Sequence, residues 1–329
     1  MNYLQLAYHF TGYYTRLQRE KKFIRKQVTP LVKQCCKKAG YRFSGEEQKK
    51  VLLYYPLFTL LGVAENYLLL RRRKIRDSER WRLVLVSMMA ALFDDLIDEE
   101  HWNEDDLLHL LHNRLEQLTL TPKANLILAL NEELYTRCPP SEAYRLALEQ
   151  GIHWQAASAG QMNKEISFEE VLLISREKNG YTSFIFAYLL EEEWTGDELY
   201  FFYQTGILGQ LVNDAYDLFK DIRGGIYTVL RKCVYVDETE KLFIHEWKKL
   251  MALLNKTSAG IPQQRQLKNR LACMYGYGLV AFNQFKQAAP NGSLAELENA
   301  TRKQLVVDME QWPTRIKLLR AIIKISKIH

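Results

Sequence analysis

Two clusters of acidic side chains lie in stretches of the sequence that are otherwise apolar. Asp94, Asp95 and Asp98 come at the end of an uncharged run that begins at Leu83. An unpaired carboxylate inside an apolar helix is costly, so these side chains need a metal ion, a basic partner or a water-filled cavity. Asp94 and Asp98 share one face of a helix, with Asp95 beside them, which suits oxygen ligands that converge on a hard divalent cation.

The second cluster lies in the segment 199–221, where Asn213, Asp217 and Asp221 follow one another at intervals of four residues. On a helix this spacing makes one stripe of oxygen ligands. Two such stripes that face each other across a cavity would hold a few magnesium ions, which bind carboxylates, water and substrate phosphate. A solvated acidic patch is the alternative, but both clusters come late in their helices, where the helix dipole disfavours acids. The predicted metal ligands are Asp94, Asp95, Asp98, Asn213, Asp217 and Asp221.

Composition narrows the class of protein. The chain has 329 residues, 47% of them hydrophobic, and a net charge of +6. Its five cysteines are odd in number and two of them are adjacent, which favours a reducing, cytoplasmic compartment. No signal peptide is evident, and no run reaches the roughly 18 apolar residues that cross a bilayer, so we expect a soluble protein. The basic clusters lack any nucleic-acid-binding motif, so we expect no nucleic-acid partner.

The hydrophobic pattern predicts an all-α protein. Apolar residues recur at spacings of three and four, and strict alternation is almost absent. Capping residues such as Ser44, Thr121 and Thr195 predict about ten to twelve helices. Helices that are apolar nearly all round belong in the middle of a bundle. Without linker-like sequence, residues 1–329 are expected to form a single all-helical catalytic domain.

Both clusters resemble the metal-binding motifs of class I isoprenoid synthases, the superfamily of terpene cyclases and trans-prenyl-transferring enzymes. Asp94, Asp95 and Asp98 match the aspartate-rich motif, and Asn213, Asp217 and Asp221 match the metal-binding positions of the cyclases' second motif. Asp214 and Lys220 also agree with that motif. The chain departs from it at position 217, where Ser or Thr is usual, and at position 221, where Glu is commoner.

The resemblance implies a fold and an activity. The fold would be an antiparallel helical bundle around a central active-site cavity that holds three magnesium ions. The activity would be ionisation of a prenyl diphosphate, either farnesyl, geranylgeranyl or longer. The carbocation would then cyclise, and diphosphate would be released.

The same resemblance suggests further site residues. Arg176 and Lys178 precede Asn179-Gly180, which we expect to interrupt a helix and expose donors to diphosphate. An ordinary surface role for Arg176 is the alternative. Lys220 lies inside the second motif, and Arg302 could close over the diphosphate. A carbocation also needs unreactive aromatic walls, because a ring face attracts a cation. The aromatic candidates are Phe58, Phe93, Trp154, Phe184 and Tyr203.

Alternatives remain within and outside this superfamily. The segment from Gln210 to Tyr227 also resembles the second motif of squalene and phytoene synthases, which condense two prenyl diphosphates. Chain-elongating synthases are disfavoured because the pattern Gly-Lys-x-x-Arg-Pro is absent. Class II cyclases are disfavoured because Asp-x-Asp-Asp is absent.

A helical lipid-binding or interaction protein is the non-enzyme alternative. Its basic tail, 315–327, would lie on an anionic membrane or pack as the last helix of the bundle. We leave open a peripheral membrane contact by that tail and a homodimer.

Overall fold

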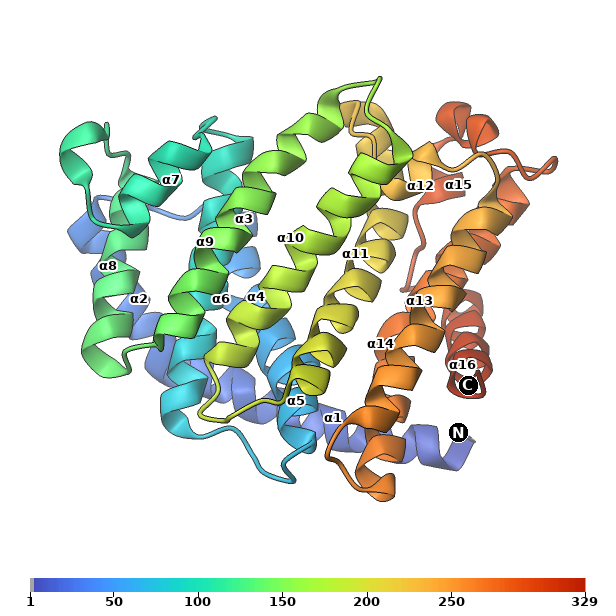
Figure 1. Ribbon diagram of the computed structural model, residues 1–329, viewed down its shortest axis with the longest axis horizontal. Helices are drawn as coiled ribbons and strands as arrows, with labels where there is room; N and C mark the ends of the chain where they lie inside the picture. Colours follow the sequence, from blue (N-terminus) through green and yellow to red (C-terminus); the bar gives the residue numbers. More distant parts are fainter. Residues whose placement is uncertain (1–2, 329) are drawn as a thin grey trace. The chain divides into compact units, whose positions relative to one another are not determined.

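The prediction of an all-α protein is confirmed by a computed structural model of the chain, drawn in Figure 1. The structure describes the backbone of residues 3–328 and the side chains of residues 10–328. Helices make up 79% of the chain, and no strand forms within the described residues. Capping behaves as predicted at Ser44 and Thr195, where each side chain accepts a hydrogen bond from the N–H of the third helical residue.

The contacts divide the chain into two compact units, so the prediction of one domain stays a prediction. The N-terminal unit comprises Leu4–Ala156 and Phe184–Glu193. Its helix α6 carries the first acidic cluster and packs on α4 and α8, while α8 also packs on α2. Its helices are α1 (Tyr3–Phe23), α2 (Thr29–Ala39), α3 (Gly45–Lys49), α4 (Tyr55–Leu57), α5 (Glu65–Leu69), α6 (Asp77–Asp98), α7 (Glu104–Leu111), α8 (Pro122–Arg137) and α9 (Glu142–Ala157), with π-helical turns η1 (Ile24–Val28), η2 (Lys50–Tyr54) and η3 (Phe58–Ala64) and the 3-10 turn η4 (Leu115–Gln117).

One continuous helical run of the N-terminal unit, Gly45–Leu69, is strongly apolar. Among the described residues it is the one helix whose length and composition would allow it to cross a membrane. Most of its apolar window, 61%, is nevertheless buried within the protein, as it is in a core helix. Composition alone therefore does not make this run a membrane span.

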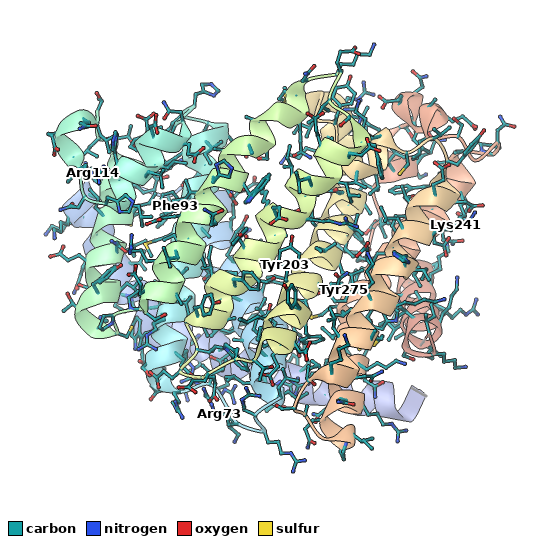
Figure 2. All side chains as sticks on the ribbon, in the orientation of Figure 1. Arg73, Phe93, Arg114, Tyr203, Lys241 and Tyr275 are labelled. Carbon is teal, nitrogen blue, oxygen red and sulfur yellow. The ribbon has the colours of Figure 1, made fainter. Side chains whose placement is uncertain are left out.

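Arg73, labelled in Figure 2, forms ion pairs that connect the segment after α10 with the start of α6. Its guanidinium lies 2.6 Å from a carboxylate oxygen of Glu79, whose side chain is fully buried, and it also pairs with Glu192. Arg76 pairs with Glu191, at 3.0 Å. A buried carboxylate needs such partners, so the basic run after α5 is used for ion pairs within this unit.

The C-terminal unit comprises chiefly Ala157–Ser183 and Trp194–His329. In it α11 packs on α13 and α14, which also pack on each other, and α14 packs on α16. Figure 1 shows α11 and α13 side by side. The helices are α10 (Phe168–Tyr188), which continues into the other unit, α11 (Gly196–Gly224), α12 (Val229–Lys232), α13 (Val236–Lys256), α14 (Ile261–Ala288), α15 (Arg302–Leu305) and α16 (Trp312–Ser326), with 3-10 turns η5 (Ser158–Met162) and η6 (Leu294–Asn299).

Helix α11 carries the second acidic cluster and has well-defined ends. A capping box of Thr195 and Glu198 begins it. Gly225 ends it with φ of +70°, in the left-handed conformation that glycine adopts without strain. The N–H of Ile226 then donates to the carbonyl oxygen of Asp221 at 2.9 Å. The helix therefore stops one turn after the last predicted metal ligand.

The prediction that Asn179-Gly180 interrupts a helix is wrong, because α10 runs through both residues. Their physical role is close packing of two helices. A Cβ atom at Gly180 would lie 2.0 Å from the ring of Tyr203, and one at Gly206 would lie 2.1 Å from the carbonyl oxygen of Asn179. Figure 2 labels Tyr203 on α11. Glycine is thus needed where α10 and α11 approach, which local sequence patterns do not reveal.

Gly206→Ala should destabilise the protein. The new methyl group would overlap a backbone oxygen, which cannot rotate away, so we expect a loss of roughly 2–3 kcal/mol in the free energy of unfolding. Gly209→Ala is the matched control on the same helix, because no atom lies within 4 Å of a Cβ placed there. It should stabilise by up to about 1 kcal/mol, since alanine favours helix. Urea unfolding followed by circular dichroism measures both, and equal effects would contradict the close packing of α10 and α11.

Candidate metal centre

The second acidic cluster is a compact set of oxygen atoms on one face of α11. The Asn213 amide donates to a carboxylate oxygen of Asp217 at 3.3 Å. Asp214 is buried, 2% exposed, and its Oδ1 accepts a 2.5 Å hydrogen bond from Gln210. The other oxygen, Oδ2, has no hydrogen-bond partner among the described residues. Asp221, one turn beyond Asp217, is also buried. This face therefore combines crowded carboxylates with an unsatisfied buried oxygen.

The crowding shifts the ionisation of two carboxyl groups. Burial raises the pKa of Asp214 from 3.8 to about 7, with a smaller contribution from the charge of Asp221. Burial raises the pKa of Asp221 to about 7 as well, and the charge of Asp217 adds to it. The protein thus resists placing several negative charges here without a compensating cation.

Lys178, Lys220 and Arg231 are cations whose charge acts on this cluster. The Lys178 ammonium, on α10, lowers the pKa of both Asp214 and Asp221, although less than burial raises it. Lys220 is exposed and lowers the pKa of Asp221 in the same way. Asn179 on α10 donates to Gln210, which holds Asp214. Helix α10 therefore brings one cation and one hydrogen-bond chain to the carboxylates of α11.

The first acidic cluster, in the N-terminal unit, is already partly neutralised. The carboxylate of Asp95 is buried and accepts a 2.5 Å ion pair from Lys50, with Lys123 at 4.0 Å. Asp94 accepts a 3.0 Å hydrogen bond from the hydroxyl of Tyr55. Asp98 is exposed at the end of α6. The three aspartates therefore differ: Asp95 pairs with lysine, Asp94 accepts from a tyrosine hydroxyl, and Asp98 is exposed.

The two clusters differ in how well they fit a magnesium ion. No three His, Cys, Asp or Glu side chains in the described part of the chain form a metal-binding group by themselves. Magnesium, however, accepts amide oxygens and keeps several waters, so fewer carboxylates suffice. The second cluster fits this chemistry best, because Asn213, Asp217 and Asp221 bring an amide and two carboxylates to one face and, among the described residues, form no ion pair. Asp95 fits a magnesium ion less well, since its carboxylate already forms an ion pair with Lys50.

Arg176 lies apart from the second cluster. Its guanidinium forms a 2.9 Å ion pair with Glu246, whose side chain is almost fully buried. Gln204 and Lys249 also donate to that carboxylate, at 2.7 and 3.1 Å. Arg176 therefore forms an ion pair with a buried carboxylate of α13, and its role in diphosphate binding stays a prediction. Arg302 is exposed at the start of α15.

The aromatic candidates do not share one environment. Phe58 is 58% exposed although its helical run is mostly buried, and its place as a cavity wall stays a prediction. Phe93, labelled in Figure 2, Trp154 and Phe184 are half-buried in the N-terminal unit. Tyr203 packs on Gly180 in the C-terminal unit. Only Tyr203 lies in the unit that carries the second cluster, where its ring fills the contact between α10 and α11.

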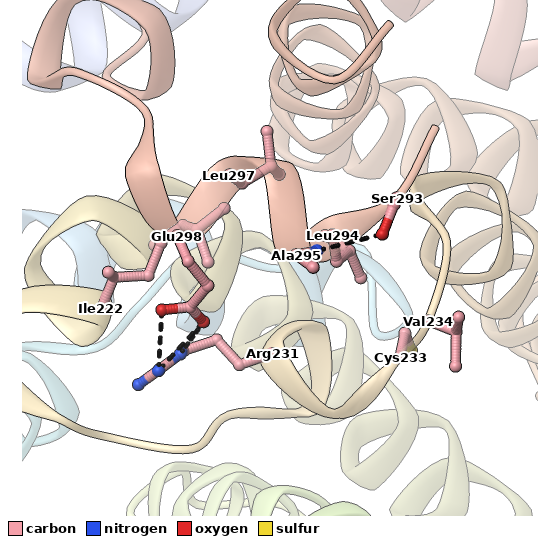
Figure 3. Close-up of a pocket in the computed structure, with 10 residues that line it drawn as sticks. Ile222, Arg231, Cys233, Val234, Ser293, Leu294, Ala295, Leu297 and Glu298 are labelled. Atoms are coloured by element: carbon pink, nitrogen blue, oxygen red, sulfur yellow. Dashed lines mark hydrogen bonds and ion pairs between the residues drawn. The ribbon is translucent and has the colours of Figure 1, made fainter. Parts of the chain in front are cut away.

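A small pocket of about 240 Å³ lies at the C-terminal end of α11. Figure 3 shows Arg231 at this pocket, ion-paired with Glu298 at 3.0 Å. Arg231 also donates to the carbonyl oxygens of Asp221 and Ile226, at 3.1 and 2.8 Å. It therefore fastens the end of the helix that bears the predicted ligands. Apolar lining residues include Leu218, Ile222, Leu294 and Leu297.

Sequence reasoning missed the partners of the acidic residues. Gln210 could have been found, because it lies four residues before Asp214 and shares its helix face. Lys50, Lys123 and Arg231 give no local signal, since the fold brings them in from other elements. Comparison with models of known protein families and with curated proteins finds no match to this chain.

The buried carboxyls should make stability depend on pH in a defined window. Well below pH 3.8 Asp221 is protonated in the folded and the unfolded chain. As pH rises to about 7 the unfolded chain releases this proton while the folded chain keeps it, so the free energy of unfolding falls. Asp221→Asn should remove this loss, which is at most on the order of 4 kcal/mol at pH 8. Urea unfolding in magnesium-free buffer from pH 4 to 8 measures the difference.

Asp197→Asn is the control, because Asp197 is an exposed aspartate in the first turn of the same helix. Its pH profile should run parallel to that of the unmodified protein. Added magnesium should raise stability at pH 8 in the unmodified protein more than in Asp221→Asn, since a ligand that binds only the folded state stabilises it. Identical profiles for Asp221→Asn and the unmodified protein would contradict the raised pKa.

Proposed function

We propose that the chain is a magnesium-dependent class I terpene synthase that ionises a prenyl diphosphate and cyclises the resulting carbocation. The observation that supports this most is the second cluster, whose buried, crowded carboxylates call for a divalent cation. The motif resemblance supports it independently, because it aligns the same residues with metal-binding positions. The expected setting is a helical bundle with a central active-site cavity.

The proposed ligands differ in how strongly the observations support each of them. Asn213, Asp217 and Asp221 are the principal magnesium ligands in the C-terminal unit, and the resemblance assigns Asp94 and Asp98 of α6 to magnesium as well. Asp95 would bind a metal only after Lys50 moves away, so we assign it a smaller part. Magnesium would supply positive charge for the departing diphosphate oxygens. The number of ions, three per site, is what the resemblance implies.

The chain's own cations would complete the binding of diphosphate. Lys178 already acts on Asp214 and Asp221, and Lys220 lies beside Asp221. When the bond between the allylic carbon and oxygen breaks, the electron pair leaves with diphosphate. Lys178 and Lys220 would then stabilise the added negative charge through an electrostatic arrangement that exists before reaction. Under this proposal Arg176 and Arg302 do not contact diphosphate. The guanidinium of Arg176 already forms an ion pair with Glu246.

The proposal predicts magnesium-dependent release of diphosphate. The full chain should release diphosphate from at least one of farnesyl, geranylgeranyl or a longer prenyl diphosphate, and chelation should abolish the release. Asp217→Asn should lower the rate roughly 100-fold or more, because it removes a charged metal ligand without changing its shape. Diphosphate release and mass spectrometry of the products measure the reaction and identify a cyclised hydrocarbon.

Asp197→Asn serves again as the control and should keep the full rate. The proposal fails if every prenyl diphosphate survives incubation with magnesium, or if Asp217→Asn and Asp94→Ala both leave the rate unchanged. A product that contains two prenyl chains would show that the enzyme condenses two substrates rather than cyclising one. The proposal of the metal site would then be retained.

A further inference from the structure

The last helix of the C-terminal unit, α16, has two opposite faces of different chemistry. One face packs on α14 and buries Leu318, Ile322 and Ile325. Contact there is close, since a Cβ atom at Gly276 would lie 2.8 Å from Ile322. The helix is therefore held firmly on the unit, and its other face stays outside.

The outer face presents a stripe at intervals of four residues: Trp312, Ile316, Arg320 and Lys324, which we call the α16 stripe. Trp312 is 73% exposed and Ile316 is 46% exposed, which is unusual for large apolar side chains. All four residues point away from the packed face, because spacing of four keeps them on one side of the helix.

Basic side chains predominate on this face. Helix α16 contains no acidic residue, and Arg315, Lys317 and Lys327 are exposed beside the α16 stripe. The guanidinium of Arg315 lies 5.6 Å from the centre of the Trp312 ring. Among the described acids, Glu240 of α13 approaches one member of the stripe, at 3.4 Å from the Lys324 ammonium. Exposed tryptophan and isoleucine within a basic surface match the headgroup region of an anionic bilayer.

We propose that the α16 stripe docks the protein on an anionic lipid surface. The basic side chains would contact lipid phosphates, and Trp312 and Ile316 would enter the interface between headgroups and acyl chains. This inference does not depend on the proposed enzymatic function, because it rests on exposure, charge and helix geometry alone. Under this proposal the basic tail packs on the unit with one face and contacts the lipid surface with the other.

Co-sedimentation of the full chain with lipid vesicles tests the proposal. Vesicles of phosphatidylcholine with about 30% phosphatidylglycerol should bind the protein, and pure phosphatidylcholine should not. The double variant Arg320→Gln, Lys324→Gln should lower the partition coefficient roughly 25-fold, at about fivefold per basic residue. Trp312→Ala should lower it as well. Ionic strength near 1 M should weaken binding, because the Debye length falls to about 3 Å.

Lys248→Gln with Lys256→Gln is the matched control, since it removes two exposed lysines from α13 and the same net charge. It should bind vesicles nearly as well as the unmodified chain. Three outcomes would overturn the proposal: no binding to anionic vesicles, an equal loss in the control, or full binding by Trp312→Ala. Full binding by Trp312→Ala would identify the face as a general polyanion site. Binding of duplex DNA to the protein, with heparin as the competitor, would support that interpretation.

Discussion

The energetic cost of burying carboxylates on α11 is the physical constraint on which the proposed metal site depends. Asp214 and Asp221 lie in an apolar helix beside Asp217, and burial raises the pKa of both to about 7. A bundle gains little stability from such an arrangement, because charge in a poorly solvated place is costly. The surrounding residues can be understood as responses to this cost: Gln210 holds one oxygen, Lys178 supplies partial compensation, and Arg231 fixes the helix end.

The two acidic clusters solve the same problem differently. Asp95 on α6 is neutralised within the protein by Lys50, while the cluster on α11 keeps an unsatisfied oxygen and unusually high pKa values. A site that is incomplete without a cation is one that a cation can stabilise. Under the proposal of a magnesium site, stability and metal binding would be linked in the C-terminal unit, and the extra acid at Asp217 would strengthen that link.

Sequence patterns predicted what depends on local spacing. The apolar periodicity gave the all-α class, capping at Thr195 placed the start of α11, and intervals of four put Asn213, Asp217 and Asp221 on one face. Local sequence patterns did not predict contacts between segments that are distant in the sequence. Gly180 was expected to break α10, but it makes room for the ring of Tyr203. Phe58 lies on a largely buried helical run, yet its side chain is exposed, because composition does not fix which side chains of an apolar helix are covered.

Crystals of the protein grown with manganese, a divalent ion that substitutes for magnesium and scatters anomalously, would test the central claim most directly. Our account predicts an anomalous peak bound by oxygen atoms of Asp217 and Asp221, with Asn213 as a further ligand. It also predicts that the peak disappears in Asp217→Asn and persists in Asp197→Asn. A structure in which Lys178 occupies the carboxylates and manganese binds elsewhere, or does not bind, would contradict it.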